Sequence, residues 1–494
     1  MPRLRTALAG LAFAVAVAVS PQLAAGQASP ASRVARDTAE RATARKFVGL
    51  RNQPLALEAF LREMPKGGDL HNHLSGSIYA ESYLRWAADD QLCLAVATFT
   101  FVAPPCNVAD GKPPVSAVIQ SSPVYNDAID AMSMRNWPAG INGHQHFFQA
   151  FAKFGLTSAA RVGDMLAEVT ARAAAEHVSY LELMLTPDGG VSSKLGREAG
   201  WPSSGAGTAA MTELRTKLLG PGWDDVLTQT RQRLDAFEAR RRDALKCATS
   251  DADAGCLVTV RYIAQVARAA PREEVFAQIL AGFEIATKEP RVVGFNLVQP
   301  EDDPVAVRDF SLHMRIIDFL RPFYPGVHIA LHAGELSDGL VPPEVLRFHI
   351  RESVRTGHAT RIGHGADAMQ EDDPVGLMHE LAAKKVLVEI ALSSNDMILG
   401  VKGSRHPLHT YLQYGVPVAL VTDDYGVARS SHTLEWLKAA QEQGLDYPTM
   451  KGMIRNSIEY SFADAQTKAR LRQGLENAFH QFEQQEAAVS PPTR

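Results

Sequence analysis

The strongest constraint on the fold is a regular recurrence of short apolar runs in the second half of the chain. From a first run centred on Val260, the next five follow at intervals of 35, 35, 32, 26 and 32 residues, centred on Phe295, Ala330, Ile362, Val388 and Leu420. Each interval has room for one helix and two loops, which make up the βα unit of a parallel sheet. The recurrence therefore predicts a parallel sheet covered by helices.

Two earlier runs, centred on Leu70 and Leu181, bring the number of expected strands to eight. Eight βα units imply an α/β fold of the (β/α)8 TIM barrel type. The first two intervals are longer, at 111 and 79 residues, so we expect insertions after the first and second strands, over about 88–138 and 188–254. The expected organisation is an N-terminal helical arm, the barrel and a flexible tail, over residues 29–63, 64–480 and 481–494.

Two helical stretches can be located from the residue pattern. One has apolar residues at helical spacing and should pack one face on the sheet: Val162, Met165, Leu166, Val169 and Ala173. The other, in the second insertion, is expected to run from Thr212 to Leu245. Its basic cluster at residues 240–242 is flanked by acidic residues, which favours a solvated face. With a net charge of -5 at pH 7, the chain gives no electrostatic basis for binding nucleic acid.

The first 28 residues have the pattern of a secretory signal peptide. Arg3 and Arg5 precede an apolar run of 13 residues, Ala7 to Val19, which small residues follow. That run is shorter than the roughly 20 residues that a membrane span needs. We therefore expect cleavage within residues 25–28 and a secreted or periplasmic protein without a membrane anchor.

The four cysteines fall into two local pairs, Cys93 with Cys106 and Cys247 with Cys256. In an oxidising compartment both pairs are expected to form disulfides, with buried free thiols as the alternative. No Cys-x-x-Cys occurs in the chain, which argues against a thiolate zinc site and against the cysteine-rich type of zinc deaminase.

The chemically informative residues stand at the ends of expected strands. His71 and His73 end the first strand, and two residues apart on a strand their side chains leave the same face. The other residues of this kind follow the fifth, sixth and eighth strands: His332 with Glu335, His364, and Asp423 with Asp424. Because the carboxyl ends of barrel strands meet at one mouth, where active sites form, we expect these side chains to converge.

Imidazoles and a carboxylate are the ligand set of zinc or a similar divalent ion, and an open coordination position makes such a site catalytic. Glu335 is placed to move protons beside the metal, so the pattern predicts metal-assisted hydrolysis. The alternative, polar residues that merely cap strands, stays open at this point. His144 and His146 repeat the His-x-His spacing, but they stand in a helix-like stretch rich in phenylalanine, so we interpret them as structural.

Six motifs, taken together and in this order, resemble the adenosine deaminase family of metal-dependent barrels. They lie between about residues 64 and 462 and are Met64-Pro-Lys-Gly-Gly-Asp-Leu-His-Asn-His-Leu-Ser-Gly-Ser77, Tyr180-Leu-Glu-Leu183, His332-Ala-Gly-Glu335, Arg361-Ile-Gly-His-Gly365, Leu392-Ser-Ser-Asn395 and Thr422-Asp-Asp424. The signal-peptide pattern and the cysteine-bearing first insertion are similar to the secreted, growth-factor-related branch of that family.

The resemblance implies hydrolytic deamination of adenosine or a related purine nucleoside, with one Zn²⁺ per chain and an activated water at its open position. The implied zinc ligands are His71, His73, His332 and Asp423. Glu335 would protonate N1 of the purine and relay protons until ammonia leaves, His364 would orient the attacking oxygen, and Asp424 would hydrogen-bond N7.

Three positions depart from the family pattern, and all are expected near the substrate. Ser75 replaces an Asp that contacts the ribose, Gln299 replaces a Gly whose backbone approaches the base, and Tyr425 replaces a Pro. An N6-substituted or otherwise modified adenine nucleoside is therefore an alternative to adenosine. The fourth strand ends at Gln299-Pro300 rather than at the Lys or Glu of two-metal relatives, which supports a single metal.

Two other functions compete with this interpretation. A metal-dependent amide or phosphoester hydrolase on the same barrel would share the metal ligands but not the purine contacts. A secreted binding or signalling protein would keep the barrel without turnover, although an intact Glu335 argues against it. A homodimer is left open by the sequence.

Overall fold

The structure is a computed structural model that describes residues 30–138 and 140–489. The expected signal peptide, residues 1–28, lies outside the described residues. Within the described ranges, no helix is both long and apolar enough to cross a bilayer.

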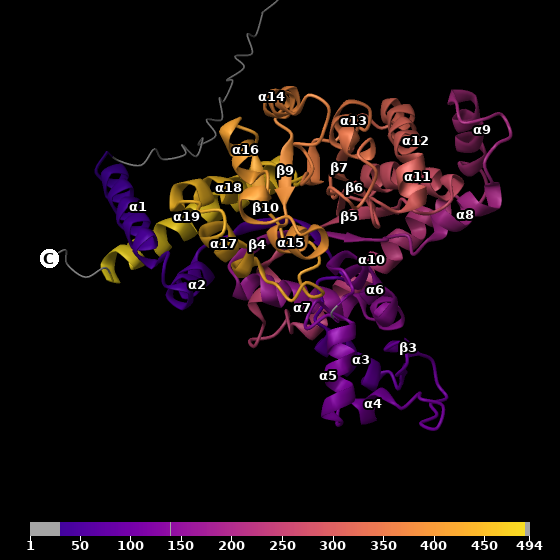
Figure 1. The fold of residues 1–494 in the computed structure, drawn as a ribbon, viewed down its shortest axis with the longest axis horizontal. Helices are drawn as coiled ribbons and strands as arrows, with labels where there is room; N and C mark the ends of the chain where they lie inside the picture. Colours follow the sequence, from indigo (N-terminus) through magenta and orange to yellow (C-terminus); the bar gives the residue numbers. More distant parts are fainter. Residues whose placement is uncertain (1–29, 139, 490–494) are drawn as a thin grey trace, which may run out of the picture.

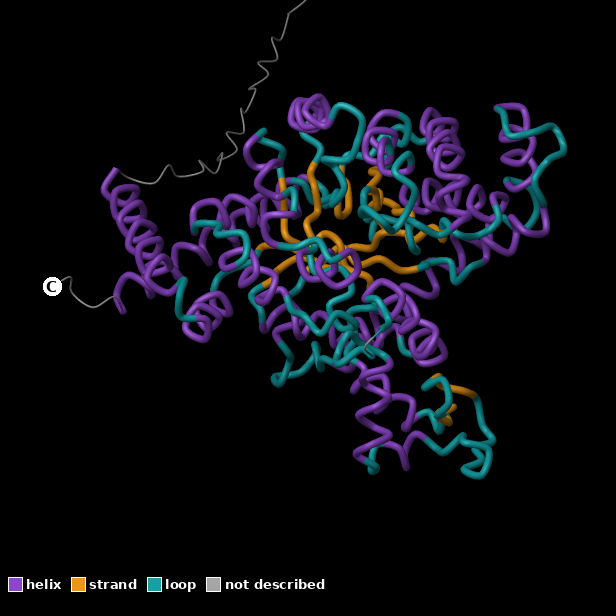
Figure 2. The backbone as a smooth tube through the Cα atoms, viewed as in Figure 1, coloured by secondary structure: helices purple, strands orange, loops and turns teal. Residues whose placement is uncertain are grey.

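Eight parallel strands form the centre of the molecule, with helices around them (Figures 1 and 2). They are β1 (Gly67–His73), β4 (Val178–Leu185), β5 (Thr259–Ala267), β6 (Val292–Val298), β7 (His328–Ala333), β8 (Arg361–His364), β9 (Leu387–Ile390) and β10 (Val418–Leu420). Each strand pairs with the next in this order. The ring closes where Asn72 of β1 bridges Asp423, just after β10, and Asp423 N donates to His71 O over 2.9 Å. The predicted (β/α)8 barrel is confirmed, and every predicted strand centre lies in one of these strands.

Helices cover the outside of the barrel. They are α7 (Val162–Ala175), α11 (Arg272–Lys288), α12 (Pro304–Leu320), α13 (His349–Arg355), α14 (Pro374–Lys384), α15 (Leu392–Leu399), α16 (Leu408–Gln413), α17 (His432–Gln441), α18 (Tyr447–Glu459) and α19 (Ala465–Val489). Helix α7 is the amphipathic helix expected from its apolar spacing. Single 3-10 turns occupy Arg321–Phe323, Val345–Arg347 and Gly403–Arg405.

The two insertions take different places on this barrel. The first holds α3 (Ala80–Asp89), β2 (Cys93–Ala95), β3 (Thr100–Val102), α4 (Val115–Val118) and α5 (Ser122–Ala131), and it projects away from the barrel (Figure 1). Helix α6 (Gly143–Ala160) leads back to the barrel. The second holds α8 (Val191–Ala199), α9 (Thr208–Leu218), α10 (Asp224–Ala244) and the 3-10 turn η1 (Ala254–Leu257).

The prediction of one helical segment from Thr212 to Leu245 is wrong. The chain forms α9 and α10 with Gly220-Pro221-Gly222 between them, because proline lacks the N–H of a helical hydrogen bond and Gly222 has a φ of +88°. The basic cluster at residues 240–242 does lie on a helix, and Arg240 pairs there with Asp164 at 2.6 Å.

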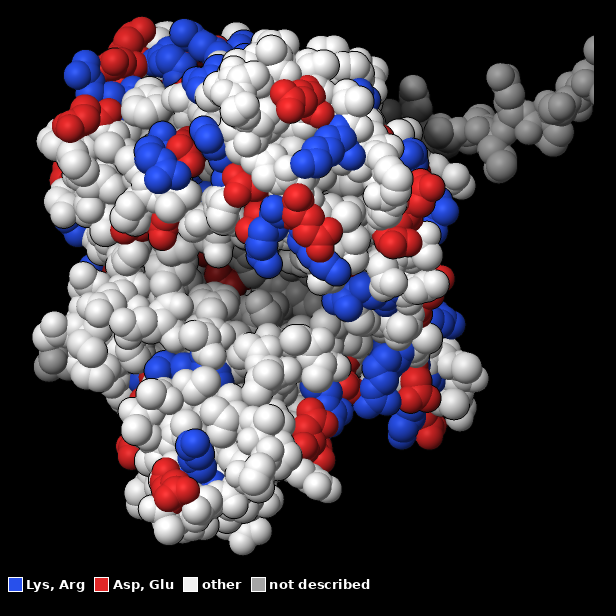
Figure 3. Space-filling model, turned by 90° about the vertical axis from the view of Figure 1, so that its right-hand side faces the viewer, with Lys and Arg blue, Asp and Glu red and all other residues white. Residues whose placement is uncertain are grey.

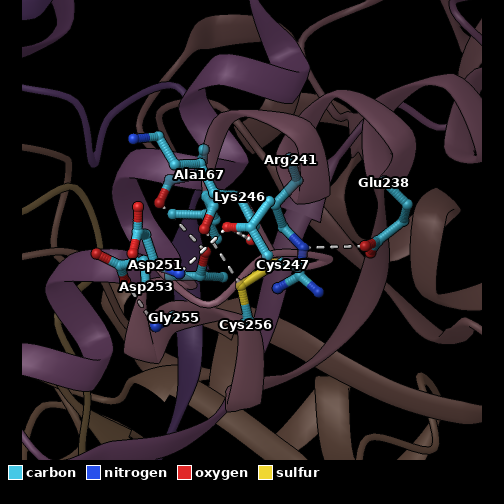
Figure 4. The surroundings of a disulfide bond; sticks show 12 residues. Ala167, Glu238, Arg241, Lys246, Cys247, Asp251, Asp253, Gly255 and Cys256 are labelled. Carbon is cyan, nitrogen blue, oxygen red and sulfur yellow. Dashed lines mark hydrogen bonds and ion pairs between the residues drawn. A yellow bond between two sulfur atoms is a disulfide. The ribbon is translucent and has the colours of Figure 1, made fainter.

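Both predicted disulfides are present, Cys93–Cys106 and Cys247–Cys256. Figure 4 shows the second, which ties the segment just after α10 to η1, immediately before β5. It therefore joins the end of the second insertion to the start of a barrel strand.

The ends of the described chain pack on each other. The N-terminal arm is α1 (Pro30–Leu50) and α2 (Pro54–Glu63), and α1 lies beside α19 (Figure 1), with Lys46 Nζ 2.7 Å from Glu486 Oε2. The predicted flexible tail 481–494 is wrong for 481–489, which belong to α19. There Phe482 and Glu483 are buried, and Glu483 accepts hydrogen bonds from Tyr447 (2.9 Å) and Lys451 (2.6 Å). Residues 490–494 lie outside the described residues.

Candidate metal centre and active site

Five side chains from four strand ends meet at the mouth of the barrel, as the sequence predicted. Donor atoms of His71, His332, His364 and Asp423 all lie within 4.8 Å of one another. His73 Nε2 is 3.1 Å from His332 Nε2 and 3.3 Å from Asp423 Oδ1. His364 and Asp423 have φ values of +70° and +55°, a conformation that non-glycine residues adopt at a cost of about 1–3 kcal/mol and keep where the surroundings enforce it.

Hydrogen bonds on the outer ring nitrogens orient two of these histidines. His71 Nδ1 donates to Glu389 Oε2 over 2.8 Å, and His332 Nδ1 donates to Asn296 Oδ1 over 2.9 Å. With Nδ1 as the donor, each ring directs Nε2 to the centre, where its neutral form offers a lone pair, which is the arrangement of metal-binding histidines. His71 Nε2 is buried and has no hydrogen-bond partner among the described residues. A buried acceptor of this kind, facing two more imidazoles and a carboxylate, fits a divalent cation.

His364 has the opposite tautomer, which a chain of hydrogen bonds fixes. Leu408 N donates to His406 Nδ1 (3.1 Å), so His406 Nε2 carries a proton and donates to Asn395 Oδ1 (3.0 Å). Asn395 Nδ2 therefore donates to His364 Nδ1 (3.0 Å). Burial lowers the pKa of His364 to about 4, so the ring is neutral and its single proton sits on Nε2. His364 is thus a hydrogen-bond donor toward the centre, whereas His71 and His332 are acceptors.

Asn395→Asp should lower kcat by about 100-fold or more, because a carboxylate there would accept from His364 Nδ1 and move the proton away from Nε2. Steady-state turnover and metal content of the purified variant check this. We expect the metal content to stay that of the wild type. Normal kcat in a folded Asn395→Asp variant would contradict the assigned tautomer.

A buried ion-pair network lies beneath the histidines, and sequence reasoning did not anticipate it. Arg361 of β8 contacts Glu389 of β9 and Glu182 of β4, each at 2.6 Å, and all three side chains are at most 1% exposed. Since Glu389 also holds His71 Nδ1, the network connects the barrel core to the candidate metal site. The Arg361 charge lowers the pKa of Glu389 against the effect of its burial, so this carboxylate stays ionised.

Arg361→Met should lower the free energy of unfolding by about 3–5 kcal/mol, because two buried carboxylates lose their partner while the side-chain volume is kept. Urea unfolding measures the change. Arg315→Met, at an exposed position on α12, is the matched control and should change stability by less than about 0.5 kcal/mol. Equal stability of the two variants would show that the network does not stabilise the barrel.

Glu335 lies two residues beyond β7, next to the histidines. Its Oε1 is 3.6 Å from His364 Nε2, and its backbone N donates to Glu301 Oε2 over 2.8 Å. Burial raises the pKa of Glu335 well above its usual range, and the negative charge of Asp423 raises it further. A carboxyl group with such a raised pKa can donate a proton near neutral pH, which is what an acid catalyst needs.

A cavity of about 360 Å³ adjoins these residues. It is lined by His73, Ser75, Phe148, Phe151, Gln265, Val298, Gln299, Pro300 and Asp424. The three predicted substrate-binding residues, Ser75, Gln299 and Asp424, are therefore all in its wall. Gln299 has a φ of +81°, and its Oε1 accepts from Ala269 N over 3.0 Å, so its amide joins the loop after β6 to the loop after β5. Figure 3 shows one face of the molecule hollowed across its middle, with an acidic side chain visible in the hollow.

Helix α6 forms one wall of this cavity, and sequence reasoning missed that role. Phe148 and Phe151 line the cavity, three residues apart on one face of the helix. His146 Nε2 contacts the carbonyls of Asp130 and Ser133, as expected of a structural histidine. His144 Nε2 contacts Asp302 Oδ1 at 2.8 Å, which fixes α6 to the loop after β6. The available signal was the phenylalanine-rich stretch that follows the two histidines.

Tyr425, the third departure from the family pattern, does not line the cavity. Its buried ring lies 6.3 Å from the ring of Tyr79, and the guanidinium of Arg172 is 5.0 Å from its centre. It therefore supports the loop after β10 from behind rather than facing the cavity.

Comparisons with known proteins agree on one family. A family model described as adenosine deaminase matches residues 228–478, from α10 to α19. The adenosine deaminase of Escherichia coli (strain SE11) is 34% identical over 149 residues, which is 30% of this chain and 41% of that protein. The chain thus matches about two-fifths of the length of this curated relative.

Two solved structures share the fold over most of the chain. An amidohydrolase from Burkholderia ambifaria, solved with bound Zn, has a TM-score of 0.57 at 18% identity and covers 88% of this chain and 95% of its own. The N6-mAMP deaminase of Arabidopsis has a TM-score of 0.55 at 19% identity and covers 85% of this chain and 99% of its own. At these identities the likeness establishes the barrel fold.

Proposed function

Because the chain belongs to the adenosine deaminase family, we propose that it hydrolyses adenosine or a related adenine nucleoside to the inosine-type product and ammonia. The observation that carries this proposal is the placement of Glu335, with its raised pKa, 3.6 Å from His364 and beside the buried histidine and aspartate cluster. An acid catalyst, a neutral donor and a set of metal ligands close to one another, next to a cavity that His73 and Asp424 line, are what water addition to a purine ring requires.

We propose that the metal is one Zn²⁺ per chain, held by His71, His73, His332 and Asp423. The lone pairs that the tautomers of His71 and His332 direct to the centre support these two ligands, and distance supports His73 and Asp423. A structural relative solved with bound Zn supports the choice of ion. When bound, such an ion supplies Lewis-acid activation of a water molecule by lowering its pKa toward neutrality.

The residues of this chain would then act as follows. Glu335 donates a proton to N1 of the adenine ring, which makes C6 more electrophilic. His364 Nε2–H donates a hydrogen bond to the water oxygen that adds to C6. The ionised Glu335 takes up the protons that this water gives off and passes them to the leaving nitrogen, so that the C6–N bond breaks, ammonia departs and the C6 oxygen becomes a carbonyl. Burial and the charge of Asp423 raise the pKa of Asp424 well above its usual range, so its protonated carboxyl can donate to N7.

Phe148 and Phe151 offer flat apolar surface to the base, as aromatic side chains commonly do for planar ligands. The neutral Ser75 and Gln299 stand where the sugar or a substituted base would lie, so an N6-substituted adenine nucleoside is the second candidate substrate. The Arabidopsis structural relative is named for an N6-methylated nucleotide, which supports keeping this candidate.

A panel of adenosine, 2'-deoxyadenosine, N6-methyladenosine, adenine and AMP, assayed for ammonia or methylamine release with metal-analysed protein, tests the function. We expect turnover of at least one of them. Hydrolysis of cyclic amides or phosphotriesters without any purine turnover would assign the protein to the rival hydrolase class. Ligand binding without turnover would assign it to the binding class.

We further propose that residues 1–28 direct export and are removed. The basic and apolar pattern of the first residues supports this, as do two disulfides, which persist in oxidising compartments. N-terminal sequencing of protein recovered from the periplasm or the medium should begin within residues 26–29. Recovery of the uncleaved chain from the cytoplasm alone would contradict export.

A further inference from the structure

A second cavity lies beside the candidate active site. It has a volume of about 470 Å³, and its wall shares Ser75 and Gln265 with the cavity that His73 and Asp424 line, so the two adjoin. The rest of its wall comes from the ends of β1 and β4 and from α6, α7 and α10. A ligand whose base lies beside the histidines would reach this second cavity by crossing between Ser75 and Gln265.

Arg233 of α10 gives the second cavity its charge. It is the only charged residue among the described residues that line this cavity. Its side chain is half-buried, and it takes part in no ion pair or hydrogen bond within the described part of the chain, while its Nε is fully shielded from solvent. Its guanidinium lies 5.1 Å from the ring centre of Phe237. A partly buried cation without an acidic partner is costly, and a bound anion would compensate it.

The loop after β4 passes close to the guanidinium of Arg233. Gly189 has a φ of +67°, and a Cβ built there would lie 3.0 Å from Arg233 Cζ, so the backbone of this loop passes close to the guanidinium. Asp188, the acidic residue of this loop, is engaged elsewhere, because it accepts from Gly190 N (3.1 Å) and Ser192 N (2.8 Å) at the start of α8. The Oε1 atom of Gln265 is also buried without a hydrogen-bond partner among the described residues.

We propose that this second cavity binds a phosphate monoester, so that the preferred substrate is a phosphorylated adenine nucleoside; the inference rests on the proposed deaminase function. Arginine remains charged at all physiological pH values, and its planar fork of N–H donors matches phosphate oxygens in pairs. The sugar would lie at the junction, where Ser75 is neutral and does not repel a phosphate. The adenine ring would remain beside Glu335 and Asp424.

Arg233→Ala tests the inference, with Arg242→Ala as its matched control. Arg242 lies on the same helix, is exposed, and does not line the cavity. For each protein, kcat/KM for ammonia release is measured with adenosine, adenosine 5'-monophosphate and adenosine 3'-monophosphate. Binding of the two monophosphates is measured in parallel by calorimetry on the metal-loaded protein.

We expect the wild type to prefer one of the monophosphates to adenosine. Arg233→Ala should lower kcat/KM for that nucleotide by about 10- to 100-fold and change the value for adenosine by less than about threefold. Arg242→Ala should behave as the wild type. A wild-type preference for adenosine, or equal losses for adenosine and the nucleotide in Arg233→Ala, would overturn the inference while leaving the deaminase function intact.

If the wild type deaminates no purine, the proposed deaminase function fails. Calorimetry then still tests whether the second cavity binds a phosphate monoester. Nucleotide binding that Arg233→Ala weakens by about 10-fold or more would support a phosphate site. Absence of nucleotide binding to the wild type would reject it.

Discussion

Glu335→Gln should lower kcat by about 10³- to 10⁴-fold with every substrate that the wild type deaminates. Glutamine keeps the size of the side chain but has no titratable proton, so neither the protonation of N1 nor the transfer of protons to the leaving nitrogen can occur through it. The raised pKa of Glu335 is the structural reason to expect a proton donor there. Single-turnover and steady-state ammonia assays measure the loss.

The Glu335 variant should keep its metal and its fold, because Glu335 is not among the proposed ligands. Glu344→Gln, at an exposed position nine residues further along the chain, is the control and should have normal kcat and metal content. If Glu335→Gln retained near-normal turnover, Glu335 would have no part in proton transfer, and another acid would have to be sought in the cavity.

Asp423→Asn should abolish turnover by removing the metal. The side chain of Asp423 is 3.3 Å from His73 Nε2 and 3.5 Å from His71 Nε2, and an amide would supply neither the charge nor the anionic oxygen that a divalent cation needs. After dialysis we expect metal content near zero and turnover below about one thousandth of the wild type, because no activated water would be available. Elemental analysis and the ammonia assay check the two expectations on the same sample.

Asp318→Asn is the control for this substitution. Asp318 is exposed on α12, where it pairs with His358 at 2.7 Å, and neither residue is among the proposed ligands. It should keep both metal and turnover. An Asp423→Asn protein that holds one equivalent of zinc and turns over normally would exclude Asp423 as a ligand.

The barrel could be predicted from sequence because each buried parallel strand can be recognised from its own residues. A strand covered on both faces is a short apolar run, and the βα unit repeats at a nearly constant interval. The candidate site followed from the same regularity, since residues that end parallel strands meet at one edge. His332 and His364 end neighbouring strands, and the barrel closure at Asp423 brings them to His71 and His73.

What the sequence did not predict depends on contacts between distant segments. Arg361, Glu182 and Glu389 are charged residues on three strands, and only the closed barrel makes them partners. Phe148 and Phe151 line the cavity because α6, which follows the first insertion, packs beside the loop after β6, and no local pattern encodes this contact. The end of α19 is ordered by its packing near Tyr447 and Lys451 of α18 rather than by its own composition.

Titration of metal-depleted protein with zinc tests the metal-dependent deaminase most directly. Ammonia release from the best substrate is followed as Zn²⁺ is added in fractions of an equivalent. Turnover should be near zero at the start, rise in proportion to bound zinc and reach its plateau at one ion per chain. Full turnover by protein shown to be free of metal, or one bound zinc per chain with no ammonia from any adenine compound, would contradict the proposed site and its chemistry.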